Sequence, residues 1–231
     1  MLYPSIDTDG IRRMYEQGES IFYYLTLGNE NYPMEPMPEG SIEGILRGMY
    51  KFRGSPLEGK KGNGKNKSKV HLLGSGSILH EALRAQQILA EKFDLPADVW
   101  SVTSYKKLRR NALECERWNR LHPTAEPRRS YVEEVLAGEK GVFVAATDYM
   151  KSVPEMITRW VPGGLTPLGT DGFGRSETRQ ALRRHFEVDA ECIAIAALDQ
   201  LARRGEIKPE RVAKAIKELG VDPEKVDPVR A

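Results

Sequence analysis

The sequence predicts an α/β domain of three layers, in which helices flank a mostly parallel sheet, preceded by an N-terminal extension. The stretch from Lys69 to Phe93 carries most of this prediction. Val70 to Leu73 form an apolar strand-like run, residues 74–77 (GSGS) make a turn, and apolar residues then recur at helical spacing. Strand-like and helical segments alternate from there to the C-terminus, which is the pattern of parallel βαβ units.

The first forty residues are expected to form a remnant of a preceding domain and a linker. Met1 to Asp9 lack apolar periodicity and predict a loose lead-in, and Gly10 to Tyr15 predict the end of a helix. Ile21 to Leu27 (IFYYLTL) is β-branched and aromatic, which predicts a strand that belongs to a different sheet. Tyr32 to Gly40 is rich in proline and predicts an extended connection between domains.

The main domain is expected to cover residues 41–231. Ser41 is a candidate cap for a helix whose apolar stripe ends at Met49. Residues 53–68 contain many lysines and glycines and one leucine, so they predict a flexible basic loop on the surface. Such a loop can also bind phosphate. However, no aromatic residue is interleaved with the lysines, which favours an insertion that is simply exposed to solvent.

The remaining elements follow in order. The segments predicted as strands are residues 98–104, 141–147 and 165–168, and those predicted as helices are 105–118, 131–136, 148–160, 177–186, 190–204 and 209–219. Ser130, Asp148, Ser176 and Asp189 are the predicted N-caps, Gly205 is a predicted C′ residue, and Pro209 opens the last helix.

The composition excludes several classes of protein. A formal charge of +2 is too small to indicate a nucleic-acid partner. Cys115 and Cys192 lie far apart within predicted helices, which favours a reducing compartment and no disulfide. No apolar run reaches eighteen residues and no signal pattern follows Met1, so we expect a cytoplasmic protein without a membrane partner.

No catalytic constellation is visible in the chain. The four histidines (His71, His80, His122 and His185) are scattered without the spacing of metal ligands, and no Gly-x-Ser-x-Gly elbow occurs. Both cysteines have the surroundings of core residues. We therefore expect no catalytic, cofactor-binding or metal-binding residue in this chain.

Polar residues that follow the predicted strands are the candidates for a ligand edge or an interface, because the carboxyl ends of parallel strands share one edge of a sheet. The glycine-rich loop at 169–176 belongs to the same edge. For the GSGS turn, a purely structural role in connecting the strand to the helix is favoured over direct contact with an anion. Capping or turn chemistry is the competing explanation for Asp148, Asn29, Glu30 and Asp171. The candidates are Asn29, Glu30, Asn31, Ser75, Ser77, Asp148, Asp171, Phe173 and Arg175.

Six blocks of sequence resemble one family of enzymes. They are NENYPMEPMPEG at 29–40, LLGSGSIL at 72–79, SVTSYKKLRRNALECERWNRLHP at 101–123, ATDYMK at 146–151, LGTDGFGRS at 168–176 and RRHFEVDA at 183–190. In this order they closely resemble the C-terminal region of the homodimeric, bacterial-type pyruvate dehydrogenases. The resemblance extends from about residue 10 to residue 231.

The resemblance implies a transketolase-like enzyme of three α/β domains, of which this chain would be the third plus the last strand of the second. The family decarboxylates pyruvate on thiamine diphosphate with Mg²⁺ and then acetylates the lipoyl group of the dihydrolipoyl acyltransferase component. The implied partners are the remaining domains of the decarboxylating component, a second copy in a homodimer, and the acyltransferase.

The family's motif for the metal and the diphosphate, its activating glutamate and its substrate histidines lie upstream of this region. We therefore carry over no catalytic residue, expect no cofactor on this chain alone, and expect a role in assembly and in the wall of the active-site channel. The alternative is a free-standing, non-catalytic module for interaction or anion binding. Two departures from the family are the basic insertion near residues 60–69 and the opening at residues 1–9, which suggests a fragment, a truncated reading frame or a split gene.

Overall fold

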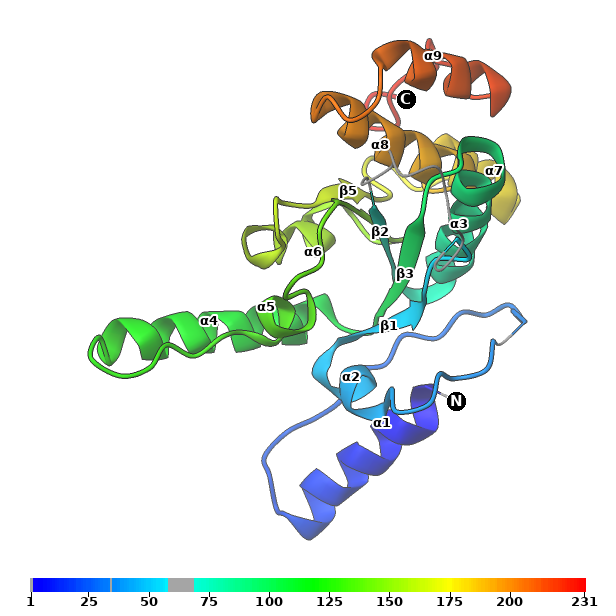
Figure 1. Cartoon of the computed structure of the whole chain (residues 1–231). Helices are drawn as coiled ribbons and strands as arrows, with labels where there is room; N and C mark the ends of the chain where they lie inside the picture. Colours follow the sequence, from blue (N-terminus) through cyan, green and yellow to red (C-terminus); the bar gives the residue numbers. More distant parts are fainter. Residues whose placement is uncertain (1, 34, 58–68) are drawn as a thin grey trace.

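The computed structural model describes residues 2–33, 35–57 and 69–231 (Figure 1). Most of the basic loop expected at 53–68 therefore lies outside the described residues. Within the described part of the chain, no helix combines the length and the apolar character needed to cross a bilayer.

The centre of the domain is a five-stranded sheet of order β1-β3-β2-β4-β5. The three pairs formed by β2, β3, β4 and β5 are parallel, and β1 runs antiparallel to β3. The predicted mostly parallel sheet is thus confirmed, with an antiparallel edge strand added. The strands are β1 (Met49–Arg53), β2 (Val70–Gly74), β3 (Ala97–Val102), β4 (Val142–Ala146) and β5 (Thr166–Leu168).

Helices cover both faces of this sheet, which gives three layers. Alternate residues of β2 point to opposite faces, so Leu72 packs in one apolar cluster and Leu73 in the other. The first face is covered by α3 (Leu79–Phe93), α8 (Ala190–Arg203) and α9 (Pro209–Glu218). The second is covered by α4 (Tyr105–Leu121), α5 (Tyr131–Val135), α6 (Ser152–Glu155) and the 3-10 turn η3 (Thr158–Trp160).

The strand–helix corner at the GSGS turn has a steric cause. A Cβ on Gly74 would lie 2.7 Å from the Cα of Leu79, so only glycine allows this close approach. The 3-10 turn η2 (Gly76–Ile78) then leads into α3. The organising βαβ unit predicted from the sequence is therefore present.

The N-terminal predictions are wrong in three places. Helix α1 (Leu2–Ile11) replaces the loose lead-in, and the helix end predicted at Gly10 to Tyr15 is confirmed as the last residues of α1 and the π-helical turn η1 (Arg12–Glu16). Ile21 to Leu27 form no strand in the described structure, because a strand needs a neighbouring strand to accept its backbone hydrogen bonds. Helix α2 (Ile42–Arg47) ends at Gly48 (φ 115°), and Met49 begins the unpredicted edge strand β1.

Three predicted caps, Asp148, Ser176 and Ser41, are also wrong. Asp148 does not begin a helix, since α6 starts only at Ser152 and has four residues. Ser176 does not cap the next helix, because Thr178 caps α7 (Arg179–His185) through a hydrogen bond from the backbone N–H of Ala181. Two other predicted caps are confirmed: Ser130, which forms a capping box, and Asp189. Ser41 precedes α2 but does not cap it, because its hydroxyl donates to the carbonyl oxygen of Pro38.

Candidate functional site

The carboxyl edge of the sheet brings together four of the predicted candidates. The Ser75 hydroxyl donates to Thr147 Oγ1 at 2.8 Å, and the Ser77 hydroxyl donates to Asp148 Oδ2 at 3.4 Å. Asp171 accepts a hydrogen bond of 3.0 Å from the backbone N–H of Lys151. These polar groups thus pair with one another across the ends of β2, β4 and β5.

A segment of the N-terminal extension lies against the same edge, and we call residues 26–32 the strap. Tyr149 donates its hydroxyl to Thr26 Oγ1 at 2.9 Å. Arg179 of α7 contacts both Asn29 and Glu30. The structure therefore brings Asn29 and Glu30 to the domain as partners of α7, whereas Asn31 is exposed.

Tyr32 at the end of the strap is held by two elements. Its ring stacks on His80 of α3 with centroids 5.5 Å apart, and its hydroxyl accepts from Arg183 Nη2 at 3.1 Å. Arg183 in turn donates to Glu81 Oε1 at 2.9 Å. The strap is thus joined through Arg183 to a buried carboxylate of α3.

Glu81 was not predicted as a functional residue, although the structure gives it a central position. It is 4% exposed and accepts hydrogen bonds from Arg84, Arg183 and the backbone N–H of Ala190. It therefore connects α3, α7 and the start of α8. The available signal was its spacing of four residues from Ala85, which places a carboxylate on a largely apolar helix face.

The two remaining candidates lie in the glycine-rich loop. Phe173 is 82% exposed. The positive charge of Arg175, added to burial, lowers the pKa of His185. At the ends of β2 and β4, the hydrogen bonds between described residues involve Ser75, Ser77, Thr147 and Asp148. Neither Phe173 nor Arg175 takes part in them.

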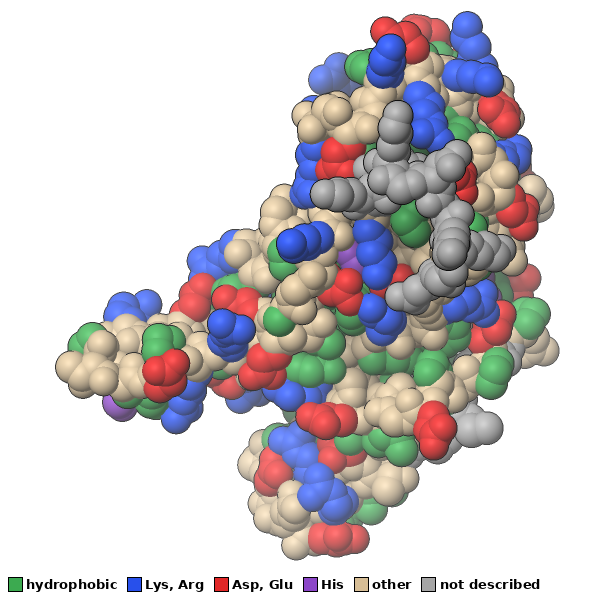
Figure 2. All heavy atoms as spheres, in the orientation of Figure 1, with side chains coloured by type: hydrophobic (Ala, Val, Ile, Leu, Met, Phe, Trp, Pro, Cys, Tyr) green, Lys and Arg blue, Asp and Glu red, His purple; other side chains and the backbone are tan. Residues whose placement is uncertain are grey.

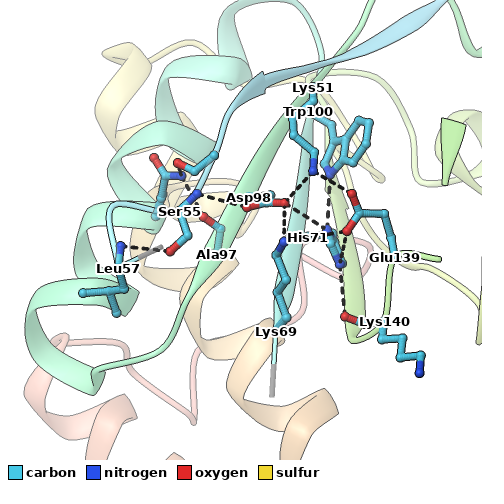
Figure 3. A network of polar contacts seen from close by, with 12 residues as sticks. Lys51, Ser55, Leu57, Lys69, His71, Ala97, Asp98, Trp100, Glu139 and Lys140 are labelled. Atoms are coloured by element: carbon cyan, nitrogen blue, oxygen red, sulfur yellow. Dashed lines mark hydrogen bonds and ion pairs between the residues drawn. The ribbon is translucent and has the colours of Figure 1, made fainter. Parts of the chain in front are cut away.

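A second polar cluster lies near the amino ends of the strands, and sequence reasoning missed it (Figure 3). The Asp98 side chain is 1% exposed, and its Oδ2 lies 2.9 Å from Lys51 Nζ and 2.8 Å from Lys69 Nζ. Glu139 Oε1 lies 2.6 Å from Lys51 Nζ. Asp98 Oδ1 accepts from the backbone N–H of Ser55 at 3.0 Å. We call Lys51, Lys69, His71, Asp98 and Glu139 the charge network.

The charges of the network explain the protonation of Asp98. Burial raises the pKa of this carboxyl, but the hydrogen bonds and positive charges of Lys69 and Lys51 outweigh burial, so its pKa is lower than that of a free aspartate. The carboxylate is therefore charged at neutral pH. It is balanced by two ammonium groups and shares Lys51 with Glu139.

His71 lies at the centre of the network as a neutral imidazole. Trp100 Nε1 donates to its Nδ1 at 3.3 Å, and its Nε2 lies 3.2 Å from the carbonyl oxygen of Lys140. These partners fit the tautomer with its proton on Nε2. Burial lowers the pKa of His71, which is fully buried and stacks on Phe143 with centroids 4.5 Å apart. Both ring nitrogens are thus occupied.

The network does not suit a divalent cation. One ligand atom each from His71, Asp98 and Glu139 lies within 4.8 Å of the others, which is close enough for metal binding. However, the carboxylates already face two ammonium groups, and the imidazole has no free lone pair. We interpret the network as a structural tie between β1, β2, β3 and the loop before β4. The sequence signal was the pair Lys69 and His71 on either side of buried Val70.

No thiol in the chain is activated as a nucleophile. Burial raises the pKa of both Cys115 and Cys192, so each is held as the unreactive thiol at neutral pH. Two cavities, of about 440 and 300 Å³, lie beside Trp100 and Trp160 respectively, and neither is lined by a candidate residue of the carboxyl edge.

Comparison with known proteins agrees with this architecture. Residues 48–189 match the family model of the transketolase-like TK C-terminal domain. The pyruvate dehydrogenase E1 component of Pseudomonas aeruginosa is 50% identical over 96% of this chain and 24% of its own length. The corresponding Escherichia coli K12 protein is 49% identical over 95% of this chain and 24% of its own length.

A solved transketolase from Leishmania mexicana is similar over 74% of this chain and 20% of its own chain, with 22% identity and a TM-score of 0.45. The chain spans about a quarter of the length of the pyruvate dehydrogenase relatives that it matches. The chain therefore belongs to the family of transketolase-like C-terminal domains, and it corresponds to the C-terminal part of the pyruvate dehydrogenase E1 component.

Proposed function

We propose that the chain serves as the C-terminal domain of a cytoplasmic pyruvate dehydrogenase, with a role in assembly and in the wall of the active-site channel. The carrying observation is the 50% identity to a pyruvate dehydrogenase E1 component over 96% of the chain. The parent protein would decarboxylate pyruvate on thiamine diphosphate with Mg²⁺ and acetylate the lipoyl group of the dihydrolipoyl acyltransferase. Its partners would be the remaining domains, a second copy in a homodimer, and the acyltransferase.

The extension supports the proposed connection to a preceding domain. Phe22 and Tyr24 are each 85% exposed, and Leu27 is 69% exposed. Such an apolar segment costs free energy in water and is typical of a surface that another element covers. We propose that the preceding domain covers the exposed apolar side chains of Ile21 to Leu27, and that the strap fixes this segment to the carboxyl edge.

The carboxyl edge is the proposed face toward the cofactor-binding part of the enzyme. Phe173, Tyr149 and Met150 expose 82%, 46% and 58% of their surfaces there, beside the paired polar groups of Asp148 and Asp171. This mixture of apolar side chains and satisfied polar groups suits a protein interface better than an anion site. The alternative of an anion-binding module is disfavoured because Asp148 places a carboxylate beside the GSGS turn.

Among the described residues, those of the carboxyl edge do not fit thiamine diphosphate. Diphosphate binding needs a metal held by carboxylate and amide oxygens or an array of free donors, and the hydroxyls of Ser75 and Ser77 are already paired. The chemistry of the family would therefore reside on groups outside this chain.

The first prediction concerns the cofactor. Because the GSGS turn is occupied by internal hydrogen bonds, titration of the purified chain with thiamine diphosphate and Mg²⁺ should give no binding heat in calorimetry. Binding in the micromolar range would contradict the assignment of the cofactor site to other parts of the parent protein.

The second prediction tests the function directly with a chimera. We expect that this chain, in place of the matching quarter of the Escherichia coli protein, restores pyruvate decarboxylation to a truncated protein that lacks this quarter. The assay is reduction of an artificial electron acceptor by pyruvate. The truncated protein alone is the negative control, and the intact Escherichia coli protein is the positive control.

A well-folded but inactive chimera would count against the proposed role. In an active chimera, the role of the strap is tested by Arg183→Ala, which removes the side chain that links Tyr32 to Glu81. If the strap positions the domain, this variant should lower activity several-fold while the chimera still binds thiamine diphosphate.

A further inference from the structure

A projecting, positively charged arm is the feature that the proposed function leaves unused. We call residues 105–130, which comprise α4 and the loop after it, the arm. It contains eight Lys or Arg residues and three Asp or Glu residues, so its formal charge is +5. Figure 2 shows it as a projection from the body of the molecule with lysine and arginine side chains along it. Only Tyr105, Leu108 and Ala112 of α4 are buried.

Most of this charge has no partner within the described structure. Of the basic side chains in the arm, Lys106, Arg109, Arg117, Arg120 and Arg129 are exposed and form no ion pair with any described residue. Like charges at this density repel one another, which costs stability unless an opposite charge is brought close.

The tip of the arm is nevertheless held in a fixed conformation. Asn119 exchanges two hydrogen bonds with the backbone of Arg128, at 2.9 and 2.8 Å. The Trp118 ring contacts the His122 ring, with centroids 4.5 Å apart, and the Arg128 guanidinium, 3.9 Å from its centroid. These contacts fix the conformation of the loop after α4, although residues 119–130 contribute no side chain to the two apolar clusters. Such an ordered, exposed surface has little conformational entropy left to lose when it binds.

The chain itself carries the complementary surface. Residues 1–40, the extension, contain seven Asp or Glu residues and two Arg residues, which gives a formal charge of −5. Glu16 and Glu39 are exposed and unpaired among the described residues. The extension also exposes Tyr15 (83%), and the arm exposes Leu121 (55%), so both surfaces offer apolar contacts as well as charge. In one molecule, α4 and α1 point in different directions (Figure 1), and among the described residues only the base of the arm, at Lys107, lies close enough to interact electrostatically with Asp9 and Arg13.

We infer that the arm of one copy binds the extension of a second copy, and that the reciprocal contact forms across a two-fold axis. A two-fold arrangement repeats the contact twice, so the same charge complementarity is used in both directions. The inference deepens the proposed homodimer and rests on that proposal for its biological role.

The test is sedimentation equilibrium of the full chain in about 0.05 M and about 0.5 M NaCl, because salt screens exposed charges. We expect a dimer whose dissociation constant rises at high salt. The arm-reversed variant Arg117→Glu/Arg120→Glu and the extension-reversed variant Glu16→Lys/Glu39→Lys should each weaken the dimer by about tenfold or more. The matched control is Arg203→Glu, an exposed position of α8 outside both surfaces.

Mixing the two reversed variants gives the sharpest outcome. The arm-reversed chain has an arm of formal charge +1 and an extension of −5, whereas the extension-reversed chain has an arm of +5 and an extension of −1. A mixed dimer contains one contact between an unchanged arm and an unchanged extension, which neither variant can form with itself, so the mixture should associate more tightly than either variant alone. Three results would each overturn the inference. They are a monomeric wild-type chain, a dimer whose dissociation constant is unchanged in both variants, and a mixture of the variants that associates no more tightly than either variant alone.

The result is separable from that of the chimera. An inactive chimera together with a successful charge swap would contradict the proposed function alone. An active chimera together with a failed charge swap would contradict this interface alone.

Discussion

Replacement of Asp98 by asparagine is expected to lower the free energy of unfolding by about 2–3 kcal/mol, because it leaves two lysines without their shared buried carboxylate. Loss of one partner of a fully buried pair typically costs about 3–5 kcal/mol. The expected cost here is smaller because the Lys51 and Lys69 side chains keep 38% and 28% exposure and can turn toward water. The asparagine can still accept the hydrogen bond from Ser55.

Urea unfolding, followed by circular dichroism, measures this change. The matched control is Asp199→Asn, which removes an exposed carboxylate paired with Arg203 on the same helix and should cost less than about 0.5 kcal/mol. Adding Lys69→Met to Asp98→Asn should recover part of the loss, because Lys69 then keeps only a contact of 3.7 Å with Glu139, whereas Lys51 keeps its pair with Glu139 at 2.6 Å. Equal effects of Asp98→Asn and Asp199→Asn would show that the network contributes no more than a surface ion pair.

The elements that the sequence predicted well are those whose signal is local. The run Val70–Leu73 and the apolar spacing after Gly74 specify β2 and α3, because burial on both faces and helical periodicity are both readable within about twenty residues. Ser130 and Asp189 were predicted as caps for the same reason, since the capping side chain and the backbone N–H that donates to it lie three residues apart.

The elements that were missed depend on partners far away in the sequence. Tyr50 and Phe52 alternate as in a strand, but β1 exists because it pairs with β3, about fifty residues later. Ile21 to Leu27 have strand propensity and no strand to pair with in the described structure. The charge network joins residues 51, 69, 71, 98 and 139, so no local window contains it.

Among the candidate site residues, the shared edge of the sheet was predictable and the contacts were not. The parallel topology brought the residues after β2, β4 and β5 together. The attachment of Asn29 and Glu30 to Arg179 spans about 150 residues and depends on the path of the strap. Their role as an interface stays a proposal that the chimera tests.

Acidification is expected to destabilise the chain between about pH 7 and pH 5, and His71 is the principal cause. Burial lowers the pKa of His71 in the folded state below its ordinary value of 6.5. Between the folded and the unfolded pKa, the unfolded chain binds more protons, so stability falls as the pH falls through this window, by at most about 1.4 kcal/mol per pH unit for one proton. Protonation also removes the acceptor that Trp100 uses.

The charges around His71 act in both directions. Glu139 and Asp98 raise its pKa, whereas Lys69 lowers it, and burial outweighs the carboxylates. The lowered pKa of Asp98 contributes stability that is lost only in a more acidic window, below the ordinary value of 3.8. The two groups are therefore separable by pH.

The measurement is urea unfolding at pH 5, 6, 7 and 8 for the wild type and for His71→Gln. The variant should be less stable at pH 8, because it disturbs the stacking on Phe143, but its stability should fall less between pH 7 and pH 5. His185, whose pKa is also lowered by burial and nearby positive charge, leaves part of the slope in the variant. His122→Gln, at the exposed tip of the arm, is the matched histidine substitution for comparison. An unchanged slope in His71→Gln would mean that the buried imidazole is not the group that titrates.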